Sequence, residues 1–476
     1  MKRLFLTIIC FFITISIFSH PWKPKHYVII DTDGGIDDMR AITMLLASPD
    51  VRVLAVTASP GSLTAGEAYI KVKSLLYSYY HEGIPVGINR ISKFKSPEFP
   101  VALSAKWGNE TGLDNRSAPD HTSLITSILT AEQTKITFIC LGSMSTAASS
   151  NKDIPIFKKQ VKQIIWSVSV PDEKEGFNYK ADISAAEAVL KGDTDVKMVR
   201  GLESGSFYTE SLLKQISELH NIYSQKISDF FSSETIKNHG FAFAGFDEMV
   251  PLYLHFQGLF NVNPGKKNAI YTPGDPNSLR NACVKILSGD IIARNQVIRE
   301  LPADPSFYFA DIEPSVSEII NKHGIDEWTS GVIANELHRH LGVFAIVGVK
   351  MGIRAREYFN TGVDEFSAVS YAGSIPPLSC MNDGIQVSTG ATPGHGLLTV
   401  RNDAPTIPSV EFTFLNRKIK LTLKPEITEK ISSELKEINF IHGLDSDIYW
   451  ELVRKNSIKY WRDLDRHEIF IIEEIK

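Results

Sequence analysis

The sequence predicts an α/β fold, a mostly parallel sheet flanked by helices, followed by a second, smaller α+β domain. Three observations support this prediction. Short apolar strands alternate with amphipathic helices from Tyr27 onward, as in chains of βαβ units. The pattern changes beyond about His323, where long helical and hairpin-like segments take over. The 476 residues are also too many for one ordinary core, so two domains are expected.

The elements of the first domain can be followed along the chain. Apolar runs predict strands at residues 27–33, 51–59, 135–143, 161–170 and 196–201. Helical spacing of apolar residues predicts helices at residues 37–48, 122–132, 145–153 and 182–192. One long amphipathic helix is predicted at residues 209–233. Asp182 is expected to be the N-cap of the helix predicted at residues 182–192. A parallel sheet of this kind binds ligands at the carboxyl ends of its strands.

The second domain is predicted from a different pattern. Residues 327–359 are helical in spacing and end before Asn360. Residues 390–400, 409–415 and 418–424 are typical of β-hairpins. A proline-rich stretch places the domain boundary near residues 302–321, so the predicted domains span 25–310 and 326–476.

The first 19 residues predict a secretory signal peptide. A basic start is followed by an apolar run of about 15 residues and a small residue near Ser19, whereas a transmembrane helix needs about 20. We therefore expect cleavage near His20, export to the periplasm or beyond the cell, and no stable membrane span. The remaining cysteines, Cys140, Cys283 and Cys380, are too few for a disulfide framework.

The overall charge argues against nucleic acid as a partner. The formal net charge is -5 and no lysine or arginine cluster stands out, which excludes a nucleic-acid-binding surface of the usual kind. Hydrophobic content of 43% and charged content of 22% are ordinary for a globular protein. The expected partner is a small molecule, and the sequence leaves a homo-oligomer open.

Four carboxylates crowd the end of the first predicted strand. Asp31 and Asp33 close the strand, and Asp37 and Asp38 open the next helix, with Gly34 and Gly35 allowing a sharp turn between them. Capping of the helix and a surface turn would explain one or two acids, but not four. Clustered carboxylates of this kind predict a site for a hard cation, Ca²⁺ or Mg²⁺, with Ca²⁺ favoured by the irregular set.

The same stretch resembles the inosine–uridine-preferring nucleoside hydrolase family, which shows D-x-D-x-G-x-D-D at this place. Three further segments resemble the family in the same order along the chain. They are residues 136–148 ("ITFICLGSMSTAA"), 176–189 ("GFNYKADISAAEAV") and 243–254 ("FAGFDEMVPLYL"). The resemblance covers roughly residues 25–310. It implies a fold related to the Rossmann type and calcium-dependent hydrolysis of ribonucleosides to ribose and free base.

The resemblance also implies roles for individual residues. Ca²⁺ would be bound by Asp33, Asp38, Asp247 and the backbone carbonyl of Leu141. Asp33 would in addition be the general base that accepts a proton from water. Asp37 would hold the ribose hydroxyls, and Asn178 would bind the sugar from the far side.

Several positions depart from the family pattern. Phe246 stands where many members have the histidine that protonates the leaving base, Ser62 replaces an asparagine, and Gly176 replaces a glutamate. An aromatic residue at 246 resembles purine-specific members, in which stacking makes the base easier to protonate. Trp107 is a candidate for a second stacking ring, with ordinary packing as its alternative, and the same alternative holds for Phe246.

The C-terminal region resembles the FmdE-like family, which is named after formylmethanofuran dehydrogenase, over roughly residues 326–476. The matching positions are His338, His340, Cys380, Asp383, Gln386, Gly390 and Thr392. Gly342 and Ala391 replace cysteines of that pattern. His338, His340 and Cys380, with His395 as a further candidate, could form a Zn²⁺ site; the alternative is that the histidines cap or pack and Cys380 is a buried thiol.

Two other functions compete with a nucleoside hydrolase. The departures at Phe246, Ser62 and Gly176 favour a non-catalytic protein that binds a nucleoside or sugar, while the intact aspartates oppose it. "DTDGG" alone also suits a phosphatase of the haloacid dehalogenase type, but that family does not need the Asp37–Asp38 pair.

Overall fold

The computed structural model describes residues 24–475 except 93, 98, 133, 169–172, 203–205, 238, 263–267, 292–296 and 298–300. The predicted signal peptide lies outside the described residues. None of the described helices combines the length and the apolar character that a membrane span requires.

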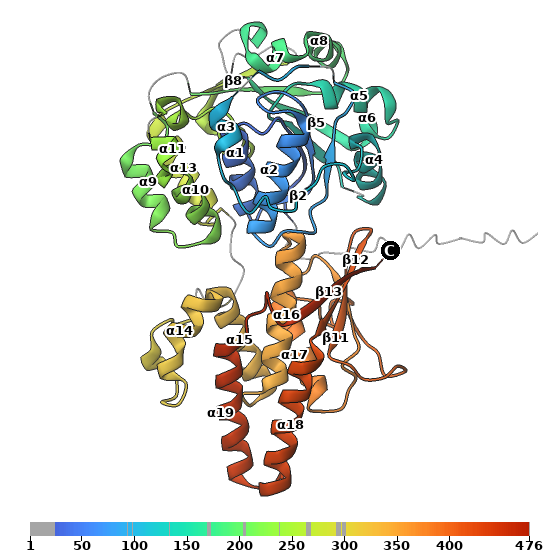
Figure 1. The fold of residues 1–476 in the computed structure, drawn as a ribbon, viewed down its shortest axis with the longest axis vertical. Coiled ribbons are helices and arrows are strands. Elements are labelled where there is room, and N and C mark those ends of the chain that lie inside the picture. The colour runs from blue at the N-terminus through green and yellow to red at the C-terminus, as the bar shows by residue number, and fades with distance from the viewer. Residues whose placement is uncertain are drawn as a thin grey trace, which may run out of the picture.

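An eight-stranded sheet with the order β3-β2-β1-β4-β5-β6-β8-β7 forms the centre of the first domain (Figure 1). All neighbouring strands are parallel except β7 and β8. The strands are β1 (His26–Thr32), β2 (Val51–Ala58), β3 (Val86–Ile88), β4 (Ile136–Cys140), β5 (Val161–Val168), β6 (Val196–Arg200), β7 (Phe260–Val262) and β8 (Ile270–Pro273). This confirms the predicted α/β class. The chain order reverses between β1 and β4, which is where such sheets bind ligands.

Helices flank this sheet, and others pack against those helices. They are α1 (Ile36–Ala47), α2 (Ala65–Ser78), α3 (Pro100–Ser104), α4 (His121–Ala131), α5 (Ser145–Asp153), α6 (Phe157–Gln160), α7 (Phe177–Ala181), α8 (Ile183–Lys191), α9 (Glu210–Ser217), α10 (Ile222–Ser232), α11 (Glu234–Lys237), α12 (Met249–His255) and α13 (Pro276–Leu287). Alternate residues of β1 face opposite cores: Val28 and Ile30 pack in one apolar cluster and Ile29 in the other. Asp182 caps α8 as predicted, because its side chain accepts a hydrogen bond from the N–H of Ala185.

The helix predicted at residues 209–233 is wrong as a single element. The structure breaks it into α9 and α10 at His220, whose φ of +49° lies in the left-handed region. Asn221 then starts α10 as its N-cap, with its side chain accepting hydrogen bonds from the N–H groups of Tyr223 and Ser224. A capping residue inside an apolar repeat ends one helix and starts another without changing the periodicity.

The second domain joins a five-stranded sheet to a group of long helices. Its helices are α14 (Glu313–His323), α15 (Ile325–His338), α16 (Val343–Phe359), α17 (Met381–Thr389), α18 (Pro425–His442) and α19 (Asp447–Asp463). Its strands are β9 (Ser367–Ser370), β10 (Leu398–Val400), β11 (Ser409–Phe414), β12 (Arg417–Leu423) and β13 (Phe470–Ile475), in the order β10-β9-β11-β12-β13. The α+β class is therefore confirmed. The predicted limits of the two domains remain predictions.

Two details of the second domain differ from the sequence-based expectation. The helical segment 327–359 is interrupted between α15 and α16 at Arg339, which has a φ of +69°. The predicted hairpin forms between β11 and β12, which pair in antiparallel register. Residues 390–400 do not form a hairpin, because β10 pairs in parallel with β9.

The two domains meet at the amino-terminal edge of the first sheet, where α16 reaches the first domain (Figure 1). The N–H of Gly83 donates to the carbonyl of Tyr358 over 2.9 Å. Arg52, at the start of β2, forms a buried ion pair with Glu365. The ring of Tyr80 stacks on that of His467 with centroids 3.6 Å apart. The carboxyl ends of the strands, where ligands are expected, lie at the other edge and stay free of this interface.

His81 makes the interface sensitive to pH. It is buried, with its ring nitrogens bonded to the carbonyl of Glu357 and the hydroxyl of Tyr223 over 2.7 and 2.8 Å. Burial lowers the pKa of His81 to about 4, although the carbonyl and carboxylate of Glu357 oppose this. His81 therefore becomes protonated near pH 6.5 in the unfolded chain, but only near pH 4 in the folded protein.

We expect acidification from about pH 7 to about pH 5 to remove about 2 kcal/mol of folding free energy through His81 alone. Urea unfolding of the wild type and of His81→Gln at both pH values measures this contribution. The pH dependence should be weaker in the variant. An identical pH dependence in both proteins would show that His81 does not titrate across the unfolding transition.

Candidate active site

The acidic stretch forms a strand, a tight turn and a helix. β1 ends at Thr32, and α1 starts at Ile36, with Gly34 between them at a φ of +79°. A Cβ at Gly34 would lie 2.9 Å from the Cβ of Ala68, so this position requires glycine for both conformation and space. The turn brings Asp31, Asp33, Asp37 and Asp38 to the carboxyl edge of the sheet, as predicted.

Asp31 lies behind the site as a supporting residue. Its carboxylate accepts hydrogen bonds from the hydroxyls of Thr57 and Ser59 over 2.6 and 2.8 Å. The side chain is fully buried, and burial raises the pKa of Asp31 to about 7. It does not line the cavity that the other three aspartates line, so it holds the end of β2 against β1.

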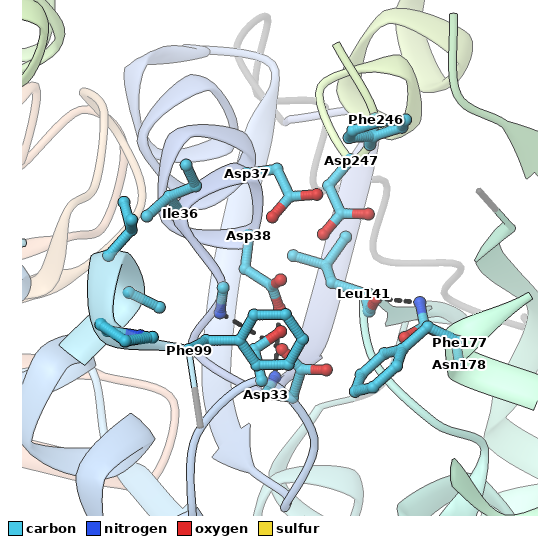
Figure 2. Close-up of a pocket in the computed structure, with 15 residues that line it drawn as sticks. Asp33, Ile36, Asp37, Asp38, Phe99, Leu141, Phe177, Asn178, Phe246 and Asp247 are labelled. Atoms are coloured by element: carbon cyan, nitrogen blue, oxygen red, sulfur yellow. Dashed lines mark hydrogen bonds between the residues drawn. The ribbon is translucent and has the colours of Figure 1, made fainter. Parts of the chain in front are cut away.

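Asp37, Asp38 and Asp247 form the closest group of carboxylates. One oxygen from each lies within 4.8 Å of the others, although Asp247 is more than 200 residues away in the chain. Figure 2 shows the three side chains pointing into the same space. Burial raises the pKa of all three. The charges of Asp33 and Asp37 raise the pKa of Asp38 further, and those of Asp37 and Asp38 raise that of Asp247. A group of this kind is costly in the fold unless a cation neutralises it.

Asp33 lies beside this group and outside it. It is 2% exposed, and its Oδ1 accepts a hydrogen bond from the N–H of Gly35 over 3.2 Å. Burial raises the pKa of Asp33 to about 6, and the charge of Asp37 acts in the same direction. The chain passes close behind this carboxylate, since a Cβ at Gly61 would lie 2.1 Å from its Oδ2.

Leu141 and Asn178, predicted as a metal ligand and a sugar ligand, touch each other. The Nδ2 of Asn178 donates to the carbonyl oxygen of Leu141 over 2.6 Å and to that of Ser167 over 3.2 Å. Leu141 follows β4 directly, and its N–H donates to the carbonyl of Asp31, which fixes it beside the end of β1. Both bonds of Asn178 use its amide nitrogen, so its amide oxygen can accept from a ligand.

A cavity of about 380 Å³ opens over the carboxylates (Figure 2), a volume suited to a small molecule. Its lining combines acidic side chains with apolar and aromatic ones. It is lined by Asp33, Gly35, Ile36, Asp37, Asp38, Ser62, Phe99, Pro100, Val101, Ala102, Leu141, Phe177, Asn178, Phe246 and Asp247. Every predicted site residue of the first domain except Trp107 is among them.

The apolar wall contains rings that the sequence did not reveal. Phe99 and Phe177 contact each other edge to face, with centroids 5.7 Å apart, and both line the cavity together with Phe246. Nothing in the order of residues marks Phe99, because it precedes a helix of five residues far from any motif. Phe177 belongs to the segment 176–189 that resembles the family, but only its neighbour Asn178 was assigned a role.

The prediction that Trp107 binds substrate is corrected by the structure. Trp107 is 1% exposed and stacks on Phe230 with ring centroids 4.8 Å apart. It belongs to the buried apolar core and does not line the cavity. The alternative of ordinary packing therefore holds for Trp107, while Phe246 lies in the cavity wall.

Arg40 and Glu248 hold the segment that carries Phe246 and Asp247. Arg40, two residues beyond Asp38 on α1, forms a fully buried ion pair with Glu248. Its guanidinium also donates to the carbonyls of Ala242 and Ala244 over 2.7 and 3.3 Å. The second oxygen of Glu248 accepts from the N–H of Phe246 over 3.0 Å. The sequence did not reveal this pair, because its members are 208 residues apart.

The residues present suit a calcium ion. Calcium prefers six to eight hard oxygen donors, and this edge offers several buried carboxylates and the Leu141 carbonyl. No histidine or cysteine is among the described residues that line the cavity, which disfavours Zn²⁺ at this place. The concentration of negative charge that would attract a cation also raises the pKa values of the aspartates, because water cannot screen the charges there.

Two of the four predicted zinc ligands of the second domain, His338 and His340, lie side by side in the structure. The rings of His338 and His340 lie 4.2 Å apart, and the Nδ1 of His338 lies 2.7 Å from an oxygen of Asp383. His395 instead faces Asp364 and the carbonyl of Gly390. Among the described residues, no group of three or more metal-ligating side chains contains any of the four predicted ligands.

Gly342 explains why this site is incomplete. A Cβ at position 342 would lie 3.2 Å from Nε2 of His338 and 3.6 Å from Nε2 of His340. The position of the missing cysteine is thus between the two imidazoles, and the chain has no side chain there. Cys380 is partly buried and is not bonded to another cysteine.

The fold and the cavity define a class of protein. It is an α/β domain whose buried carboxylates lie at the switch point of its sheet, where sheets of this kind bind ligands, and oxygen donors of this type suit a hard cation. The model of the inosine-uridine preferring nucleoside hydrolase family matches residues 28–273, which is more than half of the chain. The chain belongs to this family. A second family model, described as FmdE, molybdenum formylmethanofuran dehydrogenase operon, matches residues 337–441.

Individual relatives are distant. The pyrimidine-specific ribonucleoside hydrolase RihA of Klebsiella pneumoniae is 26% identical over 190 residues, which are 36% of this chain and 58% of that protein. Probable uridine nucleosidase 2 of Oryza sativa subsp. japonica is 26% identical over 211 residues, 41% of this chain and 61% of that protein. The chain thus matches less than two thirds of the length of either relative.

Solved structures of similar proteins cover just over half of the chain. The inosine-uridine preferring nucleoside hydrolase of Bacillus anthracis has a TM-score of 0.45 and 16% identity, covering 56% of this chain and 99% of that chain. The purine-preferring ribonucleoside hydrolase of Gardnerella vaginalis has a TM-score of 0.43 and 17% identity, covering 55% and 98%.

Proposed function

We propose that the first domain hydrolyses the N-glycosidic bond of ribonucleosides, with a preference for purine bases, in a calcium-dependent reaction that yields ribose and the free base. One observation carries the proposal. Asp247 joins Asp37 and Asp38 in a cavity that is also lined by the rings of Phe99, Phe177 and Phe246, in a chain of the nucleoside hydrolase family. The carboxylates suit a sugar and a cation, and the rings suit a base.

Calcium would be held by Asp38 and Asp247 together with Asp33 and the Leu141 carbonyl. When bound, the ion lowers the pKa of the attacking water and fixes the ribose hydroxyls. Asp37, in the same group of carboxylates, accepts hydrogen bonds from those hydroxyls. Asn178 offers its amide oxygen from the β4 side of the cavity.

Proton transfer at the site is assigned to Asp33. It is buried at the end of β1 and lines the cavity, so it accepts a proton from water over a short distance. The carboxylates around it favour the positive charge that develops on the ribosyl ring as the glycosidic bond breaks.

The leaving base gains its proton without a histidine beside Asp247. Phe246 occupies that position and lines the cavity. A Cβ at Gly201 would lie 2.6 Å from the Phe246 ring, so a side chain at position 201 would displace the ring. A purine stacked on an aromatic ring has raised basicity and can be protonated by solvent. This arrangement supports purine preference, whereas the Klebsiella and Oryza relatives carry names with pyrimidine substrates.

Incubation with inosine, adenosine, guanosine and uridine in calcium-containing buffer tests the proposal. Chromatography should show free base from the wild type, faster from the purine nucleosides, and none from Asp33→Ala. Asp114→Asn, at an exposed aspartate of the same domain, is the matched control and should keep wild-type activity. Absence of base release from all four, with ribose or nucleoside still bound, would favour a non-catalytic binding protein, the alternative that the departure at Phe246 favours.

Phe246→Ala is expected to reduce kcat/KM for inosine and guanosine about tenfold more than for uridine, the loss of about 1–2 kcal/mol of stacking. The larger purine ring has more area to stack, so it loses more. Steady-state kinetics with the three substrates measures this difference. Equal losses for purines and uridine would contradict the stacking role.

A further inference from the structure

A second group of metal-ligating side chains lies at the opposite edge of the first sheet. His26, Asp50 and His255 each place one ligand atom within 4.8 Å of the others. Among the described residues, this group and the aspartates of the cavity are the two such clusters. The first is rich in oxygen donors, whereas this one offers two imidazole nitrogens and one carboxylate.

Three separate elements build the group. His26 is the first residue of β1, Asp50 directly precedes β2, and His255 is the last residue of α12. The N–H of His26 donates to the carbonyl of Asp50 over 3.1 Å, which fixes their relative positions. The rings of His26 and His255 meet edge to face, with centroids 5.4 Å apart. The group is therefore set by the main chain of a rigid sheet edge.

The hydrogen bonds of the group leave one buried nitrogen unused. The Nδ1 of His26 is buried and has no hydrogen-bond partner. The Nε2 of His255 lies 3.1 Å from the hydroxyl of Ser48. Asp50 is 5% exposed; one of its oxygens accepts from the N–H of Lys25, and the other lies 3.1 Å from the ammonium of the exposed Lys25 side chain, which a metal ion would displace. Simple packing accounts for the Ser48 contact, but it leaves the buried nitrogen of His26 unexplained.

We propose that His26, Asp50 and His255 bind a divalent transition-metal ion, with Zn²⁺ as the preferred ion and water as a further ligand. Two imidazoles and one carboxylate are a donor set that Zn²⁺ accepts with one position left open. Ca²⁺ and Mg²⁺ prefer oxygen donors, so they favour the aspartates of the cavity.

The bound ion would stabilise the edge on which the second domain sits. It would link the start of β1 and the start of β2 to the end of α12. Arg52, two residues beyond Asp50, forms the ion pair with Glu365 of the second domain. Asp247 of the cavity lies just before α12, and His255 ends this helix. The ion would therefore anchor the end of α12 that lies away from the cavity. The site is assigned a structural role, independent of whether the cavity hydrolyses nucleosides.

Calorimetric titration of the full chain with Zn²⁺ tests the proposal, after removal of metals and saturation of the aspartates with Ca²⁺. The wild type should bind Zn²⁺, and its Tm should rise by at least about 2 °C. His255→Gln and Asp50→Asn should each weaken binding more than about 100-fold, since even an outer-shell partner of a ligand can be worth that much. The paired variant His338→Gln/His340→Gln should bind as the wild type does.

Cobalt(II) provides a second readout in the wild type. Its visible absorption should show low-coordinate nitrogen and oxygen ligation that competes with Zn²⁺, and this needs no variant to fold. Loss of Zn²⁺ binding in His338→Gln/His340→Gln with retention in both His255→Gln and Asp50→Asn would overturn the proposal and place the ion in the second domain. Absence of Zn²⁺ binding to the wild type would overturn it as well.

Discussion

Asp38→Asn is expected to abolish calcium binding and to lower nucleoside hydrolysis by about 10³-fold or more, a loss of about 4 kcal/mol of transition-state stabilisation. Asp38 lies at the centre of the site. Its Oδ1 accepts from the hydroxyl of Thr32 over 2.6 Å and from the N–H of Asp33 over 3.1 Å. Its carboxylate also shares the space between Asp37 and Asp247. Asparagine keeps the shape and removes the charge.

The same substitution should raise the stability of the metal-free protein. Burial and the charges of Asp33 and Asp37 raise the pKa of Asp38 well above its usual range, so ionising it in the fold costs free energy at pH 7. Thermal unfolding in excess chelator should therefore give a higher Tm for Asp38→Asn than for the wild type. Asp114→Asn, at an exposed residue, should leave both activity and Tm unchanged. Full hydrolysis by Asp38→Asn would contradict its place in the cation site.

Arg40→Met is expected to destabilise the protein by about 3–5 kcal/mol, because it leaves the buried carboxylate of Glu248 without its partner. It also removes the bonds to the carbonyls of Ala242 and Ala244, so the segment before Asp247 loses its anchor. Urea unfolding measures the stability, and titration of the folded variant with Ca²⁺ should show weaker binding than in the wild type.

Two further variants separate the buried charge from other effects of the substitution. Arg40→Met/Glu248→Met should be more stable than Arg40→Met alone, because no unpaired charge remains buried. Arg116→Met, which removes an exposed arginine paired with Asp114, should change stability by less than about 1 kcal/mol. An Arg40→Met protein with wild-type stability and wild-type calcium affinity would show that the ion pair does not position Asp247.

The local part of the site could be predicted from the sequence. A strand, two glycines and a helix occur within one stretch, so Asp33, Asp37 and Asp38 were placed correctly by periodicity and turn chemistry alone. Asp247, Leu141 and Asn178 were found only through ordered resemblance to a family. Nothing in their own neighbourhoods shows that they meet β1, because strand order in a sheet is set by packing over the whole chain.

The parts that were missed depend on tertiary contacts. Trp107 was a reasonable ring for stacking, yet a tryptophan next to polar residues can still be buried, and here it packs on Phe230. Phe99 and Phe177 form the wall because two distant segments meet above the cavity. The break at His220 needed one left-handed residue, which the apolar repeat does not reveal. In the second domain, family resemblance identified matching residues but could not show that His395 turns toward Asp364.

Base release from inosine by the metal-stripped full chain, with and without added Ca²⁺, tests the central claim most directly. The buried aspartates at the end of β1 and before α12 should make hydrolysis depend on the ion. We predict negligible turnover in excess chelator and recovery of turnover when Ca²⁺ is returned in excess. Undiminished hydrolysis in excess chelator, or no hydrolysis at any Ca²⁺ concentration, would contradict the claim.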